Sequence, residues 1–389
     1  MQAELEPLSR RCDVVVANPP YMGSKNMNKW LGDWIKTHYK DVKGDLFSCF
    51  MMRNVGIGAE HAQLGFMTPY VWMFIGTYEK LRKFVIQQNT ITSLIQLEYS
   101  GFSGATVPIC TFTLQKGYCP GYRGGYVRLS DFVGADQQAP RALEALANPD
   151  CGWFYRANAS RFEAIPGSPI AYWATSSTIS AFDNPLLGDL IPVKKGLDTG
   201  DNDTFLRLWH EVSISRMGIG SKNQKEFFAS CAKWAPHDKG GEYRKWYGNK
   251  EWVINWENNG SALKSSSANL RSERYYFNDA VTWNSLSSSL CSFRLSDYGA
   301  ISNTAGSSMF PRQETLLYLA LMNSSVVRRL FEFLAPTLNY SAGPVGQIPR
   351  ACITHKAVIE GLASDSVANA KQDWNSFETS WDFTRHPLV

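Results

Sequence analysis

One stretch decides the fold: DVVVANPPY, residues 13–21. The run Val14–Ala17 is continuously apolar and mostly β-branched, and a turn signal follows it. These features predict a fully buried strand of the kind found in parallel sheets. Two prolines end the strand, because proline fixes φ and has no N–H to donate. Asn18 precedes a proline and is therefore held extended at the carboxyl end of the strand, where open α/β sheets place their ligands.

The turn Asn18–Tyr21 suits one kind of chemistry. An exocyclic amine on a nucleobase is a poor nucleophile, because its lone pair is delocalised into the ring. A site that accepts hydrogen bonds from both amine protons favours a pyramidal nitrogen whose lone pair is free to attack. The side-chain carbonyl of Asn18 and the backbone carbonyl of Pro19 supply such a pair, and the prolines make it rigid. Tyr21 adds a flat face on which a flipped base can stack. The alternative is that the tetrapeptide is merely a strand-ending turn.

Residues 18–25, NPPYMGSK, resemble motif IV of the amino-methyltransferases that use S-adenosylmethionine. Across nearly all its residues, the chain resembles the adenine-specific DNA methyltransferases of bacterial phage-exclusion (BREX or Pgl) systems. The resemblance implies a site-specific, base-flipping N6-adenine DNA methyltransferase with S-adenosylmethionine as cofactor. Its partners would be double-stranded DNA and other phage-exclusion proteins. Asn18, Pro19, Pro20 and Tyr21 would be the catalytic residues.

Two further segments extend the resemblance. Residues 45–47, DLF, resemble motif V, whose helix packs beside the cofactor, so Asp45 is a candidate cofactor-binding residue. Its alternative role is that of an ordinary charge at a helix N-terminus. Residues 101–108, GFSGATVP, resemble motif VIII, where an aromatic residue stacks on the flipped base from the side opposite Tyr21. Phe102 is the matching position, and its alternative role is to close the edge of the sheet.

Methyltransferases of this type normally carry a glycine-rich cofactor loop upstream of the Asn-Pro-Pro-Tyr turn. Such a loop is a strand followed by closely spaced glycines and a later acidic residue. Residues 1–11 cannot hold it, and Gly101–Gly104 is a weak and misplaced candidate. We therefore expect the main cofactor site to be absent and a complementing polypeptide to carry it. The chain also looks shortened at its C-terminal end relative to the family, so we expect it to be inactive alone.

The composition is that of an ordinary folded protein. The 389 residues are 44% hydrophobic and 19% charged, which suits two domains and a sizeable core. A formal charge of +4 lacks the strong basic signature of a phosphate-driven binder, although basic residues can still gather on one face. None of the eight cysteines shows metal-ligand spacing. Without a signal peptide or transmembrane run, we expect a cytoplasmic chain that binds no metal and no membrane.

The expected fold class is α/β. Residues 1–118 would form the C-terminal half of a Rossmann-like class I methyltransferase domain, carrying motifs IV to VIII. Residues 119–189 begin with the turn-rich run CPGYRGGY and are expected to be a linker and connecting segment. Residues 190–350 would be a mixed α+β target-recognition domain that binds DNA, with one amphipathic helix predicted over residues 312–334. Residues 351–389 would start a helical C-terminal region.

Residues 190–350 interleave cations with aromatic residues, a pattern that suits contact with phosphates and base edges. Taken alone, such stretches are more often ordinary strand surfaces. Their position behind a base-modifying motif reverses that preference. The expected DNA-binding residues are Lys194, Lys195, Thr199, Arg244, Lys245 and Arg274.

Two other functions remain open. One is a DNA sequence-specificity module without catalysis, in which the methyltransferase remnant is only a scaffold. The other is a protein-glutamine methyltransferase, since these enzymes also use Asn-Pro-Pro-Tyr to position an amide nitrogen. They need no long aromatic-rich module downstream, so residues 190–350 argue against that function.

Overall fold

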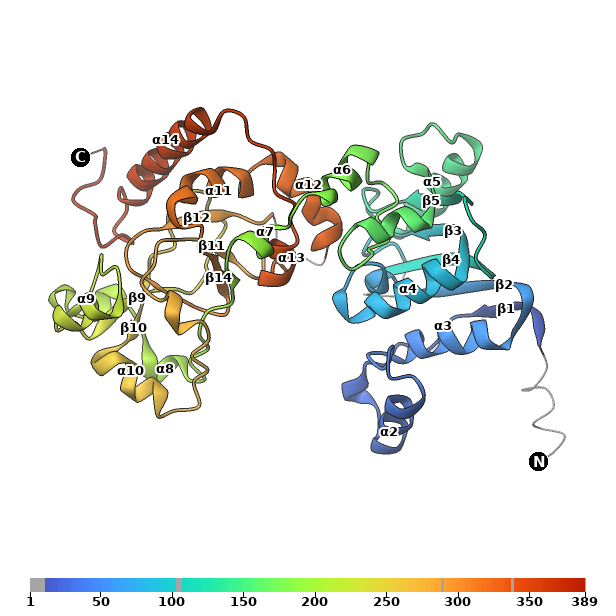
Figure 1. Cartoon of the computed structure of the whole chain (residues 1–389), viewed down its shortest axis with the longest axis horizontal. Coiled ribbons are helices and arrows are strands. Elements are labelled where there is room, and N and C mark those ends of the chain that lie inside the picture. The colour runs from blue at the N-terminus through green and yellow to red at the C-terminus, as the bar shows by residue number, and fades with distance from the viewer. Residues whose placement is uncertain (1–10, 103–106, 288–289, 337–338, 389) are drawn as a thin grey trace. The chain divides into compact units, whose positions relative to one another are not determined.

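The computed structural model describes residues 11–102, 107–287, 290–336 and 339–388. The chain forms two compact units, Met1–Asp183 and Asn184–Val389 (Figure 1). Among the helices in the described ranges, none is both long and apolar enough to span a lipid bilayer.

The first unit is built around a six-stranded sheet. Its strands are β1 (Cys12–Ala17), β2 (Gly58–Pro69), β3 (Asn89–Gln96), β4 (Ile109–Lys116), β5 (Gly124–Arg128) and β6 (Phe154–Ala157). Its α-helices are α2 (Lys29–His38), α3 (Leu46–Ile57), α4 (Glu79–Gln88), α5 (Ala135–Ala147) and α6 (Ser176–Ser180). The spatial order is β1-β2-β4-β3-β5-β6, with β1 parallel to β2 and β3 parallel to β5, while β4 is antiparallel to both neighbours. The predicted α/β class is thus confirmed, with a mixed sheet that contains parallel pairs.

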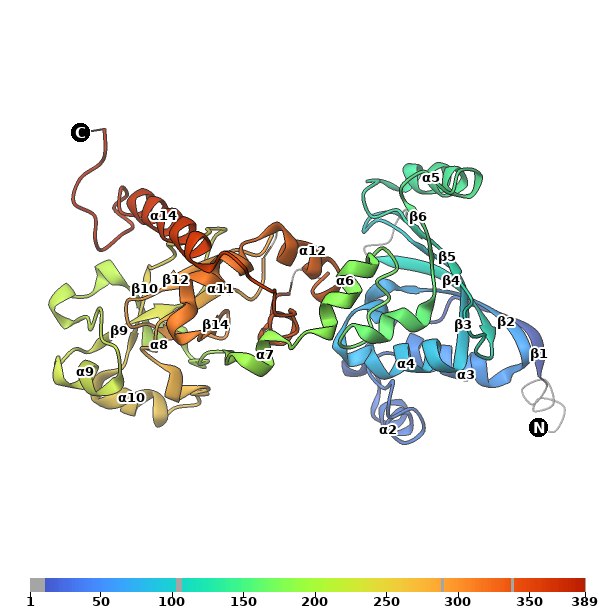
Figure 2. The ribbon, with the colours of Figure 1, turned by 45° about the horizontal axis from the view of Figure 1, so that its top comes forward.

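Helices α3 and α4 cover one face of this sheet (Figure 2). On the core side, Leu64 and Phe66 of β2 lie directly opposite Leu114 and Phe112 of β4, and all four side chains are buried. Intervening residues of β4, such as Thr113, are exposed. The sheet therefore has one covered face and one open face over β2 and β4, the alternation that a period of two produces.

Strand β1 is less buried than predicted. Val14 is 63% exposed and Val16 is 79% exposed, so the expectation of a fully buried strand is wrong. In the described part of the chain, β1 is an edge strand that pairs with β2 alone. No described element covers these two valines, although their residue types are those of a buried strand. The end of the strand is as predicted, because β1 stops at Ala17, immediately before Asn18.

Residues 119–189 do more than connect the two units. They supply β5 and β6 to the sheet, and the first compact unit extends to Asp183. Tyr172 stacks on Tyr126 of β5 at 4.9 Å between ring centroids, and its hydroxyl donates to Gln96 of β3 over 2.9 Å. Both tyrosines are buried. The expected linker is therefore corrected: the turn-rich run after β4 is a sharp connection between strands of one sheet.

The second unit contains two four-stranded sheets, ordered β13-β9-β10-β8 and β12-β11-β14-β7. The strands are β7 (Val193–Lys194), β8 (Leu206–Leu208), β9 (Trp234–Asp238), β10 (Trp252–Asn255), β11 (Ala280–Asn284), β12 (Phe293–Ser296), β13 (Ile301–Ser302) and β14 (Gly306–Met309). The α-helices are α7 (Leu187–Leu190), α8 (Asn202–Phe205), α9 (Gln224–Ala229), α10 (Glu257–Lys264), α11 (Thr315–Met322), α12 (Ser325–Leu334), α13 (Ala342–Gly346) and α14 (Lys356–Trp374).

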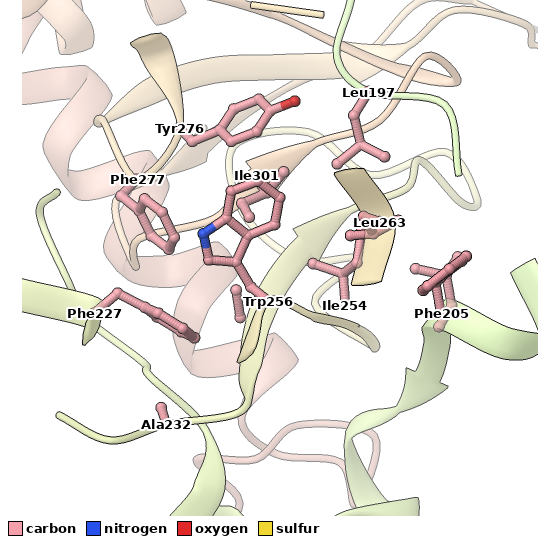
Figure 3. Close-up of a cluster of buried hydrophobic side chains, with 12 residues drawn as sticks. Leu197, Phe205, Phe227, Ala232, Ile254, Trp256, Leu263, Tyr276, Phe277 and Ile301 are labelled. Atoms are coloured by element: carbon pink, nitrogen blue, oxygen red, sulfur yellow. The ribbon is translucent and has the colours of Figure 1, made fainter. Parts of the chain in front are cut away.

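Trp256 belongs to a hydrophobic cluster in the second unit (Figure 3). The indole is fully buried and meets the ring of Tyr276 edge-on, with 5.3 Å between centroids. Gly260 has a φ of +70°, and a Cβ there would come within 2.6 Å of the indole. Phe277 is also fully buried in this cluster. Several aromatic residues that alternate with cations in the sequence therefore form the core of the unit.

The single helix predicted over residues 312–334 is broken into a 3-10 turn and two helices. The break between α11 and α12 lies at Asn323 and Ser324. The Asn323 side chain accepts from the Phe293 N–H over 3.2 Å and donates to the Phe293 carbonyl over 3.0 Å. The Ser324 hydroxyl accepts from the Val327 N–H and starts α12 as its N-cap. Such bonds compete with continuous helix, and hydrophobic periodicity does not report them.

Candidate active site

Strand pairing brings three connecting segments together at one end of the strands of the first sheet. Ala17, the last residue of β1, pairs with Phe66 of β2, and Pro69 at the end of β2 pairs with Ile109 at the start of β4. The Leu97 N–H, just after β3, donates to the Ile109 carbonyl. The Asn-Pro-Pro-Tyr turn, the residues that follow β2 and the segment that precedes β4 therefore begin at the same edge. Open α/β sheets bind their ligands where such segments meet, outside the carboxyl ends of the strands.

The Tyr21 hydroxyl holds the turn against β2. It lies 3.2 Å from Asn18 Oδ1 and 3.3 Å from the Met67 carbonyl oxygen, and its one proton is shared between these acceptors. The ring meets Phe47 of α3 edge-on, at 6.3 Å and 84°. Burial raises the pKa of Tyr21, so the hydroxyl remains a proton donor at neutral pH. The side chain is nevertheless 37% exposed.

Asn18 and Pro19 present two acceptors at the end of β1. Asn18 is exposed and Pro19 is buried. Within the described residues, Tyr21 alone donates to Asn18 Oδ1, and nothing donates to the Pro19 carbonyl oxygen. A carbonyl oxygen has two lone pairs, so Asn18 Oδ1 can accept a further hydrogen bond. The arrangement can therefore receive two donated protons, while the catalytic role of these residues stays a prediction.

Asp45 joins the turn to helix α3. Its Oδ1 accepts from the Met22 N–H over 3.0 Å and from the Phe47 N–H over 3.3 Å, which makes it the N-cap of α3. The Leu46 N–H donates to the Met22 carbonyl over 3.0 Å. Asp45 therefore lies at a helix N-terminus, which was the alternative to cofactor binding in the sequence analysis. Contact with a cofactor stays a prediction.

Phe102 is 48% exposed, and residues 103–106 of its segment lie outside the described residues. In the described part of the chain, Phe102 makes no ring contact with Tyr21, so its role in base stacking stays a prediction. Tyr70 is an aromatic candidate that the sequence analysis missed. It follows β2 directly at the same edge, is partly buried, and meets Phe74 edge-on at 6.2 Å. In the sequence, Tyr70 directly follows Pro69, which ends an apolar run, and this pattern marks Tyr70 as a candidate.

Three of the six predicted DNA-binding residues lie in neighbouring segments of the second unit. Lys194 lies in β7 opposite Ser308 of β14, and Lys195 is exposed. The Ser272 hydroxyl donates to the Lys195 carbonyl over 3.0 Å, which places the segment carrying Arg274 beside β7. Arg274 is also exposed. These three cations are available to a partner.

The other three predicted DNA-binding residues have partners within the fold. Thr199 is 2% exposed, and its hydroxyl donates over 2.6 Å to Oδ1 of Asn202, three residues further along the chain in α8. Its DNA contact stays a prediction. Arg244 pairs with Asp373 at 3.4 Å and lies over the Trp374 ring. Lys245 donates to the Asn323 carbonyl over 3.3 Å. The interleaved pattern could not distinguish these packed cations from free ones.

Comparison with known proteins supports the expected resemblance. Residues 7–102 match the Eco57I restriction-modification methylase family. The chain is 34% identical over 98% of its length to the adenine-specific methyltransferase PglX of Lacticaseibacillus casei (strain Zhang). It is 36% identical over 98% of its length to the adenine-specific methyltransferase BrxX of Escherichia coli O9:H4 (strain HS). It spans 33% and 31% of these relatives, respectively.

Solved structures show the same fold. The Type IIL restriction-modification enzyme MmeI, solved in complex with DNA, matches 96% of this chain and 51% of its own, with a TM-score of 0.60 and 11% identity. A nuclease-deletion mutant of the Type ISP enzyme LlaGI, solved with a DNA substrate mimic, matches 94% of this chain and 36% of its own, with a TM-score of 0.57 and 12% identity. The resemblance seen in the sequence is therefore confirmed: nearly the whole chain is similar to about a third of the PglX and BrxX adenine-specific methyltransferases.

Proposed function

We propose that the chain is the base-binding and DNA-recognition part of a site-specific N6-adenine DNA methyltransferase of a phage-defence system. The observation that carries the proposal is the pair of acceptors at the end of β1, Asn18 Oδ1 and the Pro19 carbonyl, held by Tyr21. The first unit would be the C-terminal half of a class I methyltransferase domain. The second unit would be the target-recognition domain.

In this proposal, the target adenine leaves the duplex and its exocyclic amine donates to both acceptors. The two hydrogen bonds draw the nitrogen toward a pyramidal geometry and free its lone pair for attack. Tyr21 would stack on one face of the base and Phe102 on the other. Each stack is worth about 1–3 kcal/mol, which offsets part of the cost of unstacking the base.

We propose that the described residues do not hold S-adenosylmethionine by themselves. Asp45, the candidate contact, already binds two backbone N–H groups through Oδ1. Beside β1, no described strand or glycine-rich turn lies on the outer edge. We therefore assign to these residues the binding and orientation of the adenine, and no step of the methyl transfer itself.

The open edge of β1 supports a complementing cofactor-binding half. Val14 and Val16 leave apolar surface exposed beside unpaired strand edge, and natural proteins rarely leave such an edge uncovered. We propose that a strand of the cofactor-binding half pairs along β1 and covers these valines. The chain without that half would be inactive.

The test combines the purified chain with the cofactor-binding half of a PglX-type relative and measures N6-methyladenine in duplex DNA by mass spectrometry. We expect no product from the chain alone and product from the combination. Asn18→Ala should lower the rate about 100-fold or more, since removing one preorganised polar contact to the reacting group has effects of that size. Val16→Lys should abolish complementation, whereas Val326→Lys, at a 64% exposed site in α12, should not.

Each alternative has its own outcome. Methylation by the chain alone would refute its dependence on a second half. Full activity of Asn18→Ala would refute the proposed adenine site. Sequence-specific binding that survives Asn18→Ala, with no methylation in any combination, would favour a pure specificity module. Methylation of a glutamine-containing peptide in place of DNA would favour a protein-glutamine methyltransferase.

A further inference from the structure

The second unit contains an open pocket of about 600 Å³ that the sequence analysis did not find. It lies where the 3-10 turn Glu273–Tyr275 meets the residue before β7 and the residues after β14. Pro192 and Phe310 line it together, and the Phe310 N–H donates to the Pro192 carbonyl over 3.1 Å. Three cations line the pocket, which are Lys222, Arg274 and Arg312, and the carboxylate of Asp279 also lines it.

Two of the three cations carry charge that the fold does not neutralise. The Lys222 ammonium lies 3.0 Å from Asp279 and also donates to the Asp297 carbonyl, so its charge is paired. Arg274 and Arg312 are exposed, and neither forms an ion pair with any described residue. Because Asp279 is engaged by Lys222, these two guanidinium groups leave the pocket with uncompensated positive charge.

The carboxylates next to these arginines in the sequence are also engaged elsewhere. Glu273, which precedes Arg274, lies 2.6 Å from the ammonium of Lys264. Glu314, two residues after Arg312, lies 2.8 Å from the ammonium of Lys356. The acidic groups closest along the chain are therefore bound by lysines and not by the pocket arginines.

An aromatic pair supports one of these arginines. Tyr275 stacks on Phe310 with 4.7 Å between ring centroids and 17° between ring planes. The Arg274 guanidinium lies 4.8 Å from the centroid of the Tyr275 ring. A cation over an aromatic face is held by the ring quadrupole, and its N–H edges stay free to donate. The stack therefore positions Arg274 without consuming its hydrogen-bond donors.

We propose that this pocket binds backbone phosphates of duplex DNA through Arg274 and Arg312. Guanidinium groups are donors only, and phosphate oxygens match their planar geometry with paired hydrogen bonds. Lys194 and Lys195 follow Pro192 in the sequence and extend the positive surface beside the pocket. Contacts of this kind set the position of a protein on DNA and carry no sequence information directly. The inference rests on the proposed DNA-recognition role of the second unit.

The test measures binding of the whole chain to a fluorescent duplex by anisotropy, over salt concentrations from about 50 to 200 mM. The variant is Arg274→Gln/Arg312→Gln. If each arginine contacts one phosphate, the slope of log affinity against log salt should become shallower by about 2. We expect affinity at low salt to fall about tenfold or more, and to fall equally for unrelated DNA sequences.

The matched control is Arg328→Gln/Arg329→Gln, which removes the same charge from exposed positions of α12. Equal losses in both double variants would overturn the proposal in favour of a general charge effect. An unchanged slope in the pocket variant would also overturn it, and in that case inorganic phosphate is added alone. Thermal stabilisation by phosphate in the parent but not in the pocket variant would then identify a site for free phosphate.

The binding assay distinguishes failure of the pocket inference from failure of the proposed function. If the parent chain binds DNA and the pocket variant binds equally well, the pocket inference fails and the proposed function stands. If the parent chain fails to bind DNA even with the cofactor-binding half present, the proposed function fails, and the pocket inference fails with it.

Discussion

Replacing Asp45 by alanine tests how the turn after β1 is held in place. The substitution removes the N-cap of α3, which typically costs about 1 kcal/mol. It also removes the acceptor of the Met22 N–H, a partly exposed hydrogen bond to a carboxylate, worth about another 1 kcal/mol. We expect local opening of this region to become easier by about 2 kcal/mol, which is roughly a 25-fold change in an equilibrium constant.

The assay is hydrogen exchange of the Met22 and Phe47 amides in the purified chain, followed by mass spectrometry or NMR. Both amides should exchange roughly 25-fold faster in Asp45→Ala. Asp45→Asn is the control, because asparagine caps helices about as well as aspartate and keeps the acceptor oxygen. Parent-like exchange in Asp45→Ala would refute the clamping role. If Asp45→Asn retains the clamp but loses methylation in the complemented enzyme, the carboxylate charge has the separate cofactor role expected from the sequence.

Three further predictions concern the second unit. Trp256→Ala should destabilise it by about 3–5 kcal/mol in urea unfolding, because the indole is fully buried, whereas Trp30→Ala, at a 74% exposed position of the first unit, should change stability little. Ser324→Ala should cost about 1 kcal/mol through loss of the α12 cap, and a value near zero would mean that Asn323 alone sets the break between the helices. Burial lowers the pKa of Lys250 to about 7. Because the unfolded lysine keeps its proton to a pH of about 10, the unfolded state binds more protons above pH 7 and stability should rise with pH there. Urea unfolding of Lys250→Met should show a flatter rise between about pH 7 and 8.5 than the parent chain, and identical slopes would contradict the prediction.

Local patterns in the sequence located much of the candidate site. A strand followed by two prolines specifies its own end, because proline cannot continue the ladder of hydrogen bonds, and β1 does stop at Ala17. Tyr21 was identified because its spacing from Asn18 is part of a short motif. What the motif could not show is the bond from Tyr21 to Met67, which joins residues 46 positions apart.

Exposure and pairing depended on the tertiary structure. Val14 and Val16 have the residue types of a buried strand, yet the surroundings of β1 leave them in solvent. Arg244 and Lys245 looked like Arg274 in the sequence, and only the packed fold shows that Arg244 pairs with Asp373 and Lys245 donates to a backbone carbonyl. Arg274, by contrast, forms no ion pair with any described residue.

The sequence by itself therefore determined where the first strand ends, the position of the Asn-Pro-Pro-Tyr turn and the resemblance to adenine-specific methyltransferases. Only the tertiary structure decided that residues 119–183 belong to the first unit and supply two strands to its sheet, that Asp45 clamps the turn, and that Arg274 and Arg312 line one pocket. The physical reason is the distance along the sequence between the residues that interact. Strand ends, caps and motifs are set by neighbours within a few residues, whereas burial and charge pairing depend on residues that lie far apart along the chain.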